Sequence, residues 1–172
     1  GLEDLRLGIL RGLSEENFHQ DPLRVLRCLR FAAQLKFRID EETWHWACQA
    51  SSGLRDVSGE RIAVELEKFF ATTEAPQLEY FRELAPAREL FGASVVDDRL
   101  LFEAVAAGLL TGERSLELGL ALWLGDRLDF TLSVDELVAR LRVSNRVERF
   151  LVGWVRGLAC LRETPVLTLR SI

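Results

Sequence analysis

Three arginines follow an Asp-Pro pair in residues 20–31, and their types and spacing suit the binding of a nucleotide. Arg24, Arg27 and Arg30 recur every third residue, which places their guanidinium groups along a strip of a helix. Asp21 stands at the helix entrance as a candidate N-cap, and the proline after it suits a first helical turn. A cationic strip that ends in a carboxylate can bind phosphates and the hydrogen-bonding edge of a base.

The same pattern also has a purely structural interpretation. Asp-Pro is a common helix start, so Asp21 would act as a cap and nothing more. The three arginines would then form a solvated face or pair with acidic neighbours, as exposed basic residues usually do. The pattern alone leaves both interpretations open.

Length and composition indicate a folded chain. The 172 residues are 48% hydrophobic and 28% charged, which is typical of one ordinary globular domain or two small ones. The apolar stretches are too short to span a bilayer and no signal peptide is visible, so we expect no membrane partner. Cys28, Cys48 and Cys160 fit neither a metal motif nor a disulfide framework, which favours a cytoplasmic location.

The net charge of −5 is unevenly distributed. Residues 20–38 hold five basic side chains and one acidic side chain. Residues 39–138 hold eight basic and twenty acidic side chains. Residues 139–172 are basic again, with seven basic and two acidic side chains. A basic region can meet a polyanion, so the candidates for contact with an RNA backbone are Arg140, Arg142, Arg146 and Arg149. A solvated helix face is the alternative for these four.

Hydrophobic spacing predicts helices and shows no persuasive run of strand alternation. Capping residues, prolines and glycines place the helices at about residues 21–36, 40–50, 59–72, 76–84, 86–91, 97–110, 113–124, 134–141 and 145–161. Residues 14–20 are expected to form a turn, and residues 164–172 to be β-prone or disordered. We therefore predict an all-α fold with a soft boundary near residues 72–76.

Residues 20–35 closely resemble the neck motif of bacterial tRNA nucleotidyltransferases (CCA-adding enzymes) and the related poly(A) polymerases. Other segments resemble further parts of that family in the same order. They are residues 1–5 with Arg11 (the motif that joins head to neck), residues 37–43, residues 58–62 (the Glu-Arg-Ile motif) and residues 141–146 (a body segment). The resemblance is specific over residues 1–70.

The resemblance implies an order of head, neck, body and tail. Residues 1–19 would be a remnant of the junction between head and neck, residues 20–73 the neck domain that reads the base, and residues 74–172 a helical body domain. The family's head holds Mg²⁺ on two aspartates, and this sequence contains no Asp-x-Asp pair. We therefore expect the neck and body of an enzyme, inactive without its catalytic head domain.

The resemblance assigns base selection to Asp21 and Arg24. Cytosine and adenine both present an amino donor beside a ring-nitrogen acceptor, which an accepting Asp and a donating Arg complement. Guanine and uracil reverse that order, which leaves polar groups unpaired at a cost of about 1–3 kcal/mol each. The expected substrates are thus CTP and ATP. Arg27 and Arg30 would contact the nucleotide or brace the site, and Gln20 stands where the family usually has Glu.

The leading hypothesis is part of an RNA 3′-end nucleotidyltransferase that adds CCA, or only CC or A, to tRNA. Its partners would be tRNA or another RNA 3′ end, CTP and ATP, and its own head domain. A poly(A) polymerase of the same family is one alternative. A non-catalytic all-α module that binds RNA or a protein is another.

Overall fold

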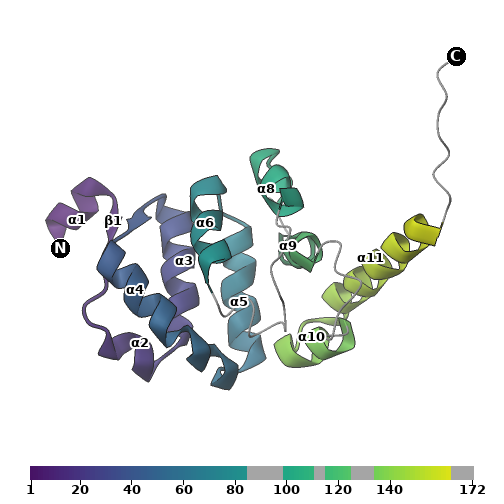
Figure 1. Ribbon diagram of the computed structural model, residues 1–172, viewed down its shortest axis with the longest axis horizontal. Coiled ribbons are helices and arrows are strands. Elements are labelled where there is room, and N and C mark those ends of the chain that lie inside the picture. Colours follow the sequence, from purple (N-terminus) through teal and green to yellow (C-terminus); the bar gives the residue numbers. More distant parts are fainter. Residues whose placement is uncertain (85–98, 111–114, 125–133, 164–172) are drawn as a thin grey trace, which may run out of the picture.

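The computed structural model describes residues 1–84, 99–110, 115–124 and 134–163. Its elements are α1 (Leu2–Leu7), β1 (Ile9–Leu10), α2 (Glu16–Gln20), α3 (Leu23–Leu35), β2 (Arg38–Ile39), α4 (Glu41–Ala50), the 3₁₀ helix η1 (Ser51–Asp56), α5 (Gly59–Phe70), α6 (Ala75–Glu83), α8 (Arg99–Ala106), α9 (Ser115–Leu124), α10 (Val134–Leu141) and α11 (Asn145–Glu163). Most of the described residues are helical and the two strands have two residues each, which confirms the all-α prediction. Figure 1 shows an elongated arrangement with α1 at one end and α11 at the other.

Helices α3 and α5 form the centre of the N-terminal half. The apolar side chains of α3 recur at helical spacing, so that Val25 and Leu29 are fully buried. They face α5, where Ile62 and Leu66 are equally buried. The end of α5 adds Phe69 and Phe70, which pack with Phe81 of α6 at ring distances of 5.3–5.7 Å. This packing fixes the face that α3 turns outward.

The chain before α3 is attached to the rest by a small parallel sheet. Ile9 pairs with Arg38 and Leu10 with Ile39, which brings the segment after α1 next to the loop between α3 and α4. Each strand has two residues, too few for the alternation that marks a strand in a sequence. The sequence analysis therefore missed both strands.

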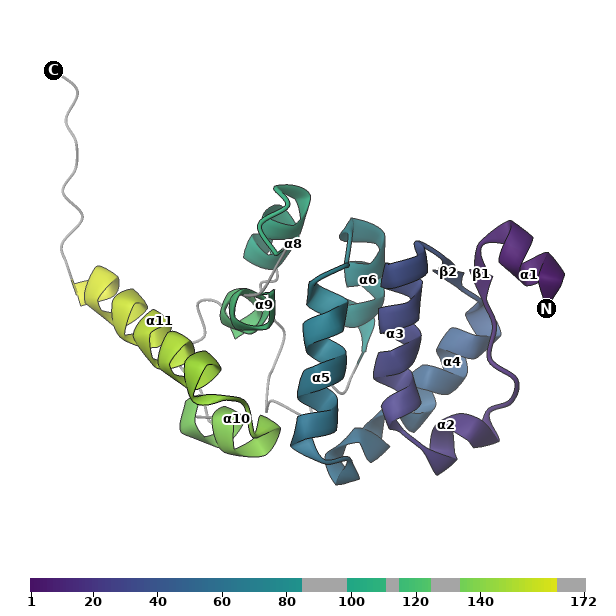
Figure 2. The ribbon, with the colours of Figure 1, turned by 180° about the vertical axis from the view of Figure 1, so that it is seen from behind.

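The second half continues the helical row. Helix α5 contacts α3 on one side and α9 and α10 on the other, and α11 packs on α9 and α10. Figure 2 shows α10 beside the end of α5 at which η1 lies. None of the described helices combines the length and the apolar composition that crossing a bilayer requires.

The helix limits agree with the expected ones to within a few residues, with three local differences. Helix α3 begins at Leu23 and Pro22 occupies its N-cap position without a side-chain cap, so the prediction that Asp21 caps this helix was wrong. Residues 16–20 form α2 and not a turn, and the 3₁₀ helix η1 lies between the helices expected at residues 40–50 and 59–72. The predicted helix at 86–91 and the tail at 164–172 lie outside the described residues.

Candidate functional site

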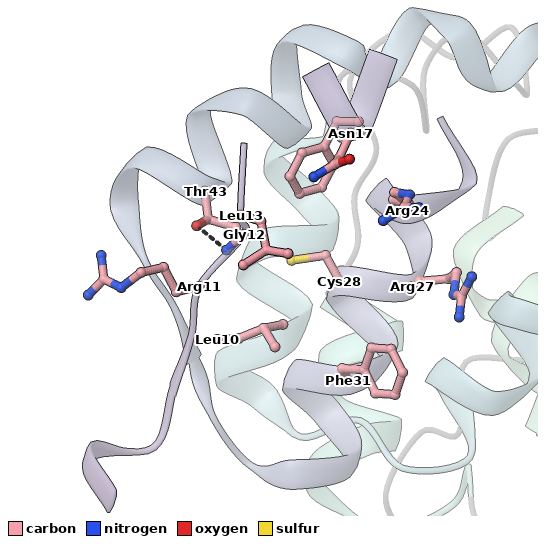
Figure 3. Close-up of a pocket in the computed structure, with 11 residues that line it drawn as sticks. Leu10, Arg11, Gly12, Leu13, Asn17, Arg24, Arg27, Cys28, Phe31 and Thr43 are labelled. Carbon is pink, nitrogen blue, oxygen red and sulfur yellow. Dashed lines mark hydrogen bonds between the residues drawn. The ribbon is translucent and has the colours of Figure 1, made fainter. Parts of the chain in front are cut away.

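A pocket of about 330 Å³ lies between α3 and the segment that follows β1. Arg24 and Arg27 extend from the exposed face of α3 on one side of it, as Figure 3 shows. The remaining lining residues are Leu10, Arg11, Gly12, Leu13, Asn17, Phe18, Cys28, Phe31 and Thr43. The sequence analysis predicted the two arginines but not the opposite wall, because that wall comes from residues before the helix and from α4.

The wall formed by residues 11–13 is held in place by polar contacts. The Gly12 amide donates to Thr43 Oγ1 at 2.8 Å, the dashed contact in Figure 3. Arg11 Nη1 donates to Asp40 Oδ1 at 2.6 Å. Asp40 in turn caps α4 by accepting from the Thr43 amide, and the helix starts close to residue 40, as expected from the sequence. This side of the pocket is thus tied to the start of α4.

Arg11 also pairs with Asp4, on the helix that precedes β1. Its Nε lies 3.1 Å from Asp4 Oδ1. The Arg11 guanidinium therefore sits between two carboxylates and, in Figure 3, points away from the pocket. Arg24 and Arg27 remain as the cations that face an incoming anion.

Asp21 lies just before α3, and its carboxylate is directed toward α5. Arg61 Nη2 lies 3.4 Å from Asp21 Oδ1, and the Asp21 side chain is 29% exposed. The Arg24 amide donates to the Asp21 carbonyl at 2.9 Å, so the two residues are joined through the backbone. Within the described ranges no ion pair joins their side chains, and Asp21 does not line the pocket. The proposed base-reading pair thus occupies adjoining positions without a side-chain contact.

Arg30 is placed differently from the other two arginines of the strip. It is buried between α3 and α5, where its Nε donates to Glu65 Oε2 at 2.5 Å. Its Nη1 donates to Gln34 at 2.7 Å, and the guanidinium lies 4.0 Å from the ring centre of Phe31. Of the two roles expected for Arg30, these contacts support bracing, because they direct its buried guanidinium to partners inside the protein.

The four basic candidates of the C-terminal region all make contacts within the chain. Arg140 Nη2 donates to three carbonyl oxygens of residues 54–57. Arg142 pairs with Glu60 and Arg146 with the buried Glu117, while Arg149 Nε donates to the Asn145 carbonyl. Arg142, Arg146 and Arg149 are exposed enough to meet a phosphate as well. RNA contact by these residues stays a prediction.

The described residues do not offer a metal site. Within these ranges, no three His, Cys, Asp or Glu side chains come together as ligands would. The donor set of the described residues therefore does not fit the Mg²⁺ that the family resemblance implies. Cys28 lines the pocket, but burial raises its pKa to about 12, so the thiol is protonated and unreactive.

The pocket combines two exposed cations with apolar and amide groups. Arg24 and Arg27 can donate to phosphate or base oxygens and ring nitrogens. Phe31 offers an aromatic surface for stacking, and Asn17 carries both a donor and an acceptor. A volume of about 330 Å³ suits part of a nucleotide, such as its base. Phe31 belonged to the sequence motif, whereas no pattern in the sequence pointed to Asn17.

The chain matches a family model and a set of known proteins. Residues 36–88 match the family described as "Probable RNA and SrmB-binding site of polymerase A". The CCA-adding enzyme of Leuconostoc mesenteroides is 39% identical over 79 residues, which are 45% of this chain and 20% of that protein. The CCA-adding enzyme of Bacillus licheniformis is 36% identical over 104 residues, or 59% of this chain and 26% of that protein.

Solved structures share the fold over almost the whole chain. The Thermotoga maritima CCA-adding enzyme complexed with tRNA has a TM-score of 0.73 and 22% identity, covering 95% of this chain and 42% of that one. A CCA-adding enzyme in complex with ATP has a TM-score of 0.71, also at 22% identity, over 94% of this chain and 40% of that one. The chain thus spans about a fifth to a quarter of the curated relatives and under half of these solved chains.

Proposed function

We propose that this chain, which is part of a protein of the CCA-adding enzyme and poly(A) polymerase family, selects the incoming nucleotide for addition to an RNA 3′ end. The observation that carries this proposal is the pocket beside α3, with Arg24 and Arg27 exposed on its wall. Relatives matched over part of the chain are named CCA-adding enzymes, and structures sharing the fold include complexes with ATP and with CTP.

Base selection in this proposal uses Asp21 and Arg24 as an acceptor and a donor. Asp21 now meets Arg61, and at 3.4 Å that contact is long for a charged hydrogen bond. The carboxylate is partly exposed, so it can accept from the amino group of cytosine or adenine without breaking a strong bond. Arg24 would donate to the ring nitrogen beside that amino group. GTP and UTP present the opposite order and are rejected.

The neighbouring residues support this arrangement in distinct ways. Arg27 lies one turn further along the pocket wall and is placed to meet phosphate or sugar oxygens. Arg30 braces α3 against Glu65 and does not meet the nucleotide. Gln20 stands where the family usually has Glu, and its side chain donates to Glu16 at 3.1 Å. The residue directly before Asp21 is therefore uncharged.

The rest of the enzyme follows from the chemistry. Nucleotidyl transfer requires metal-bound carboxylates, and the described residues do not form such a site. We infer that the catalytic carboxylates and Mg²⁺ belong to a separate head domain and that the 172 residues alone do not incorporate nucleotides. The division into residues 1–19, 20–73 and 74–172 is part of the same proposal, as are a tRNA or other RNA 3′ end as partner and a cytoplasmic location.

The RNA partner rests on two observations. The matched family is described by an RNA-binding site, and one structure with the same fold contains tRNA. Arg142, Arg146 and Arg149 would contact the RNA backbone, in addition to their contacts within the chain.

Incorporation of single nucleotides tests the proposal. The full-length protein that carries this chain is given tRNA without its 3′ end and each of the four NTPs in turn. We expect incorporation of C and A and rejection of G and U. Long A tracts on any RNA would favour a poly(A) polymerase, and no incorporation at all would favour the non-catalytic binding module.

A further inference from the structure

We propose that Arg140 of α10 is a positioning residue that fixes the corner of the fold in which Asp21 sits. The sequence analysis grouped Arg140 with residues that contact RNA, and nothing in the comparisons assigns it a role. Its guanidinium is turned inward, toward the end of η1. The effect on nucleotide selection rests on the function proposed above, whereas the positioning itself does not.

Three backbone acceptors surround the Arg140 guanidinium. Nη2 lies 3.0 Å from the Leu54 carbonyl oxygen, 2.9 Å from that of Arg55 and 3.0 Å from that of Val57. These carbonyls belong to the last turn of η1 and the residue after it, at the helix end that carries partial negative charge, and the Leu54 carbonyl also accepts from the Val57 amide. A cation there satisfies several of them at once, so Arg140 holds the end of η1 to α10.

Helix α10 also comes very close to the start of α5. A Cβ atom on Gly59 would lie 1.7 Å from the Arg140 carbonyl oxygen, so only glycine allows this contact. Arg142 Nη1 adds a pair with Glu60 Oε1 at 3.2 Å. The backbone of residues 140 and 141 therefore rests directly on the first turn of α5. Arg140 thus holds both η1 and α5 through one short segment.

Both of these elements reach Asp21. From η1, Gly53 packs so tightly on Pro22 that a Cβ there would lie 2.6 Å from the proline Cγ. From the first turn of α5, Arg61 reaches the Asp21 carboxylate at 3.4 Å. The corner formed by Asp21 and Pro22 is thus bounded by η1 and α5. Arg140 fixes the positions of η1 and α5 relative to each other.

This geometry distinguishes a positioning role from contact with RNA. A phosphate accepts a lysine in place of an arginine, because the charge remains. The carbonyl contacts are all made by the terminal Nη2, and a lysine side chain ends one bond short of that position. Arg140→Lys therefore separates the two roles. Arg156→Lys, at an exposed position on α11, is the matched control.

Amide hydrogen exchange of the 172-residue chain tests the positioning directly. Arg140→Lys should speed exchange at the amides of Arg24 and Arg61, in the first turns of α3 and α5, by about tenfold, as expected from the loss of one charged hydrogen bond. The Trp44 amide at the start of α4, which is bonded to the Asp40 carbonyl, should be unchanged. Unchanged exchange at both corner amides, or equal acceleration at all three, would overturn the proposal.

Nucleotide selection by the full-length protein tests the consequence. Arg140→Lys should lower the preference for CTP over UTP by about tenfold, and adding it to Asp21→Ala should lower the preference no further, because both changes act through the same carboxylate. Independent, multiplying effects in the double variant would overturn the route through Asp21. Faster exchange at the corner, with unaltered selection in both single variants, would support the positioning and refute base reading by Asp21.

Discussion

Replacing Arg30 with methionine should destabilise the chain strongly, because Arg30 is the partner of a buried carboxylate. The side chains of Arg30 and Glu65 are each 11% exposed, and Nε lies 2.5 Å from Oε2. Methionine has a similar length and no charge, so the variant leaves Glu65 buried without its cation. A spacing of six residues from Arg24 turns Arg30 by about 120° around the helix, away from the pocket and toward α5.

The size of the effect follows from these contacts. Removing one partner of a buried ion pair costs about 3–5 kcal/mol. The lost hydrogen bond to Gln34 and the contact with Phe31 add smaller amounts of the same sign. For a chain of this length, a loss of that size lowers the melting temperature by roughly 10 °C. Removing both charges, as in Arg30→Met with Glu65→Leu, should recover most of the loss.

Urea unfolding of the 172-residue chain, followed by circular dichroism, measures these changes. Arg27→Met is the matched control, because Arg27 belongs to the same strip but is exposed, and it should change stability by less than about 0.5 kcal/mol. A loss below about 1 kcal/mol for Arg30→Met, or a double variant less stable than the single one, would refute the bracing role.

Three further predictions concern the pocket wall and the contact between α10 and α5. Asp40→Ala should lower the free energy of unfolding by about 1–2 kcal/mol in the same assay, because it removes the cap of α4 and a partner of Arg11. The control Glu41→Ala should be nearly neutral, and equal effects of the two variants would contradict the capping role. Cys28, with a pKa of about 12, should have a thiolate fraction of about one in ten thousand at pH 8. Alkylation of its peptide, followed by mass spectrometry, should therefore be slow at pH 8 and rise with pH, and rapid labelling of folded protein at pH 8 would show that it is not buried. Gly59→Ala should cost about 3 kcal/mol in thermal unfolding, since its Cβ would strike the Arg140 carbonyl, and a stable variant would contradict the contact between α10 and α5.

The helical part of the fold could be predicted from the sequence because its signals are local. The apolar spacing of α3 and the signals that place a helix start near residue 40 each lie within a few residues, and they gave elements close to those observed. The same reasoning failed at Asp21, because the carboxylate has a second option in Arg61, forty residues further along the chain. Local capping rules do not include such a partner.

The candidate site could be predicted in part. The exposed position of Arg24 and Arg27 follows from the apolar positions around them, whereas the partner that buries Arg30 does not, because Glu65 is on another helix. The second wall of the pocket depends on the pairing of β1 with β2, which leaves no periodic pattern in four residues. Long-range contacts of this kind are what the sequence alone could not supply.

Nucleotide incorporation by the Arg24→Ala variant of the full-length protein tests the central claim most directly. Arg24 is exposed on the pocket wall, so its removal should leave the helical fold and the melting temperature unchanged. The loss of a charged donor to the base should lower kcat/KM for both C and A by about 10- to 100-fold. Incorporation of both nucleotides at close to the unmodified rate would contradict the account.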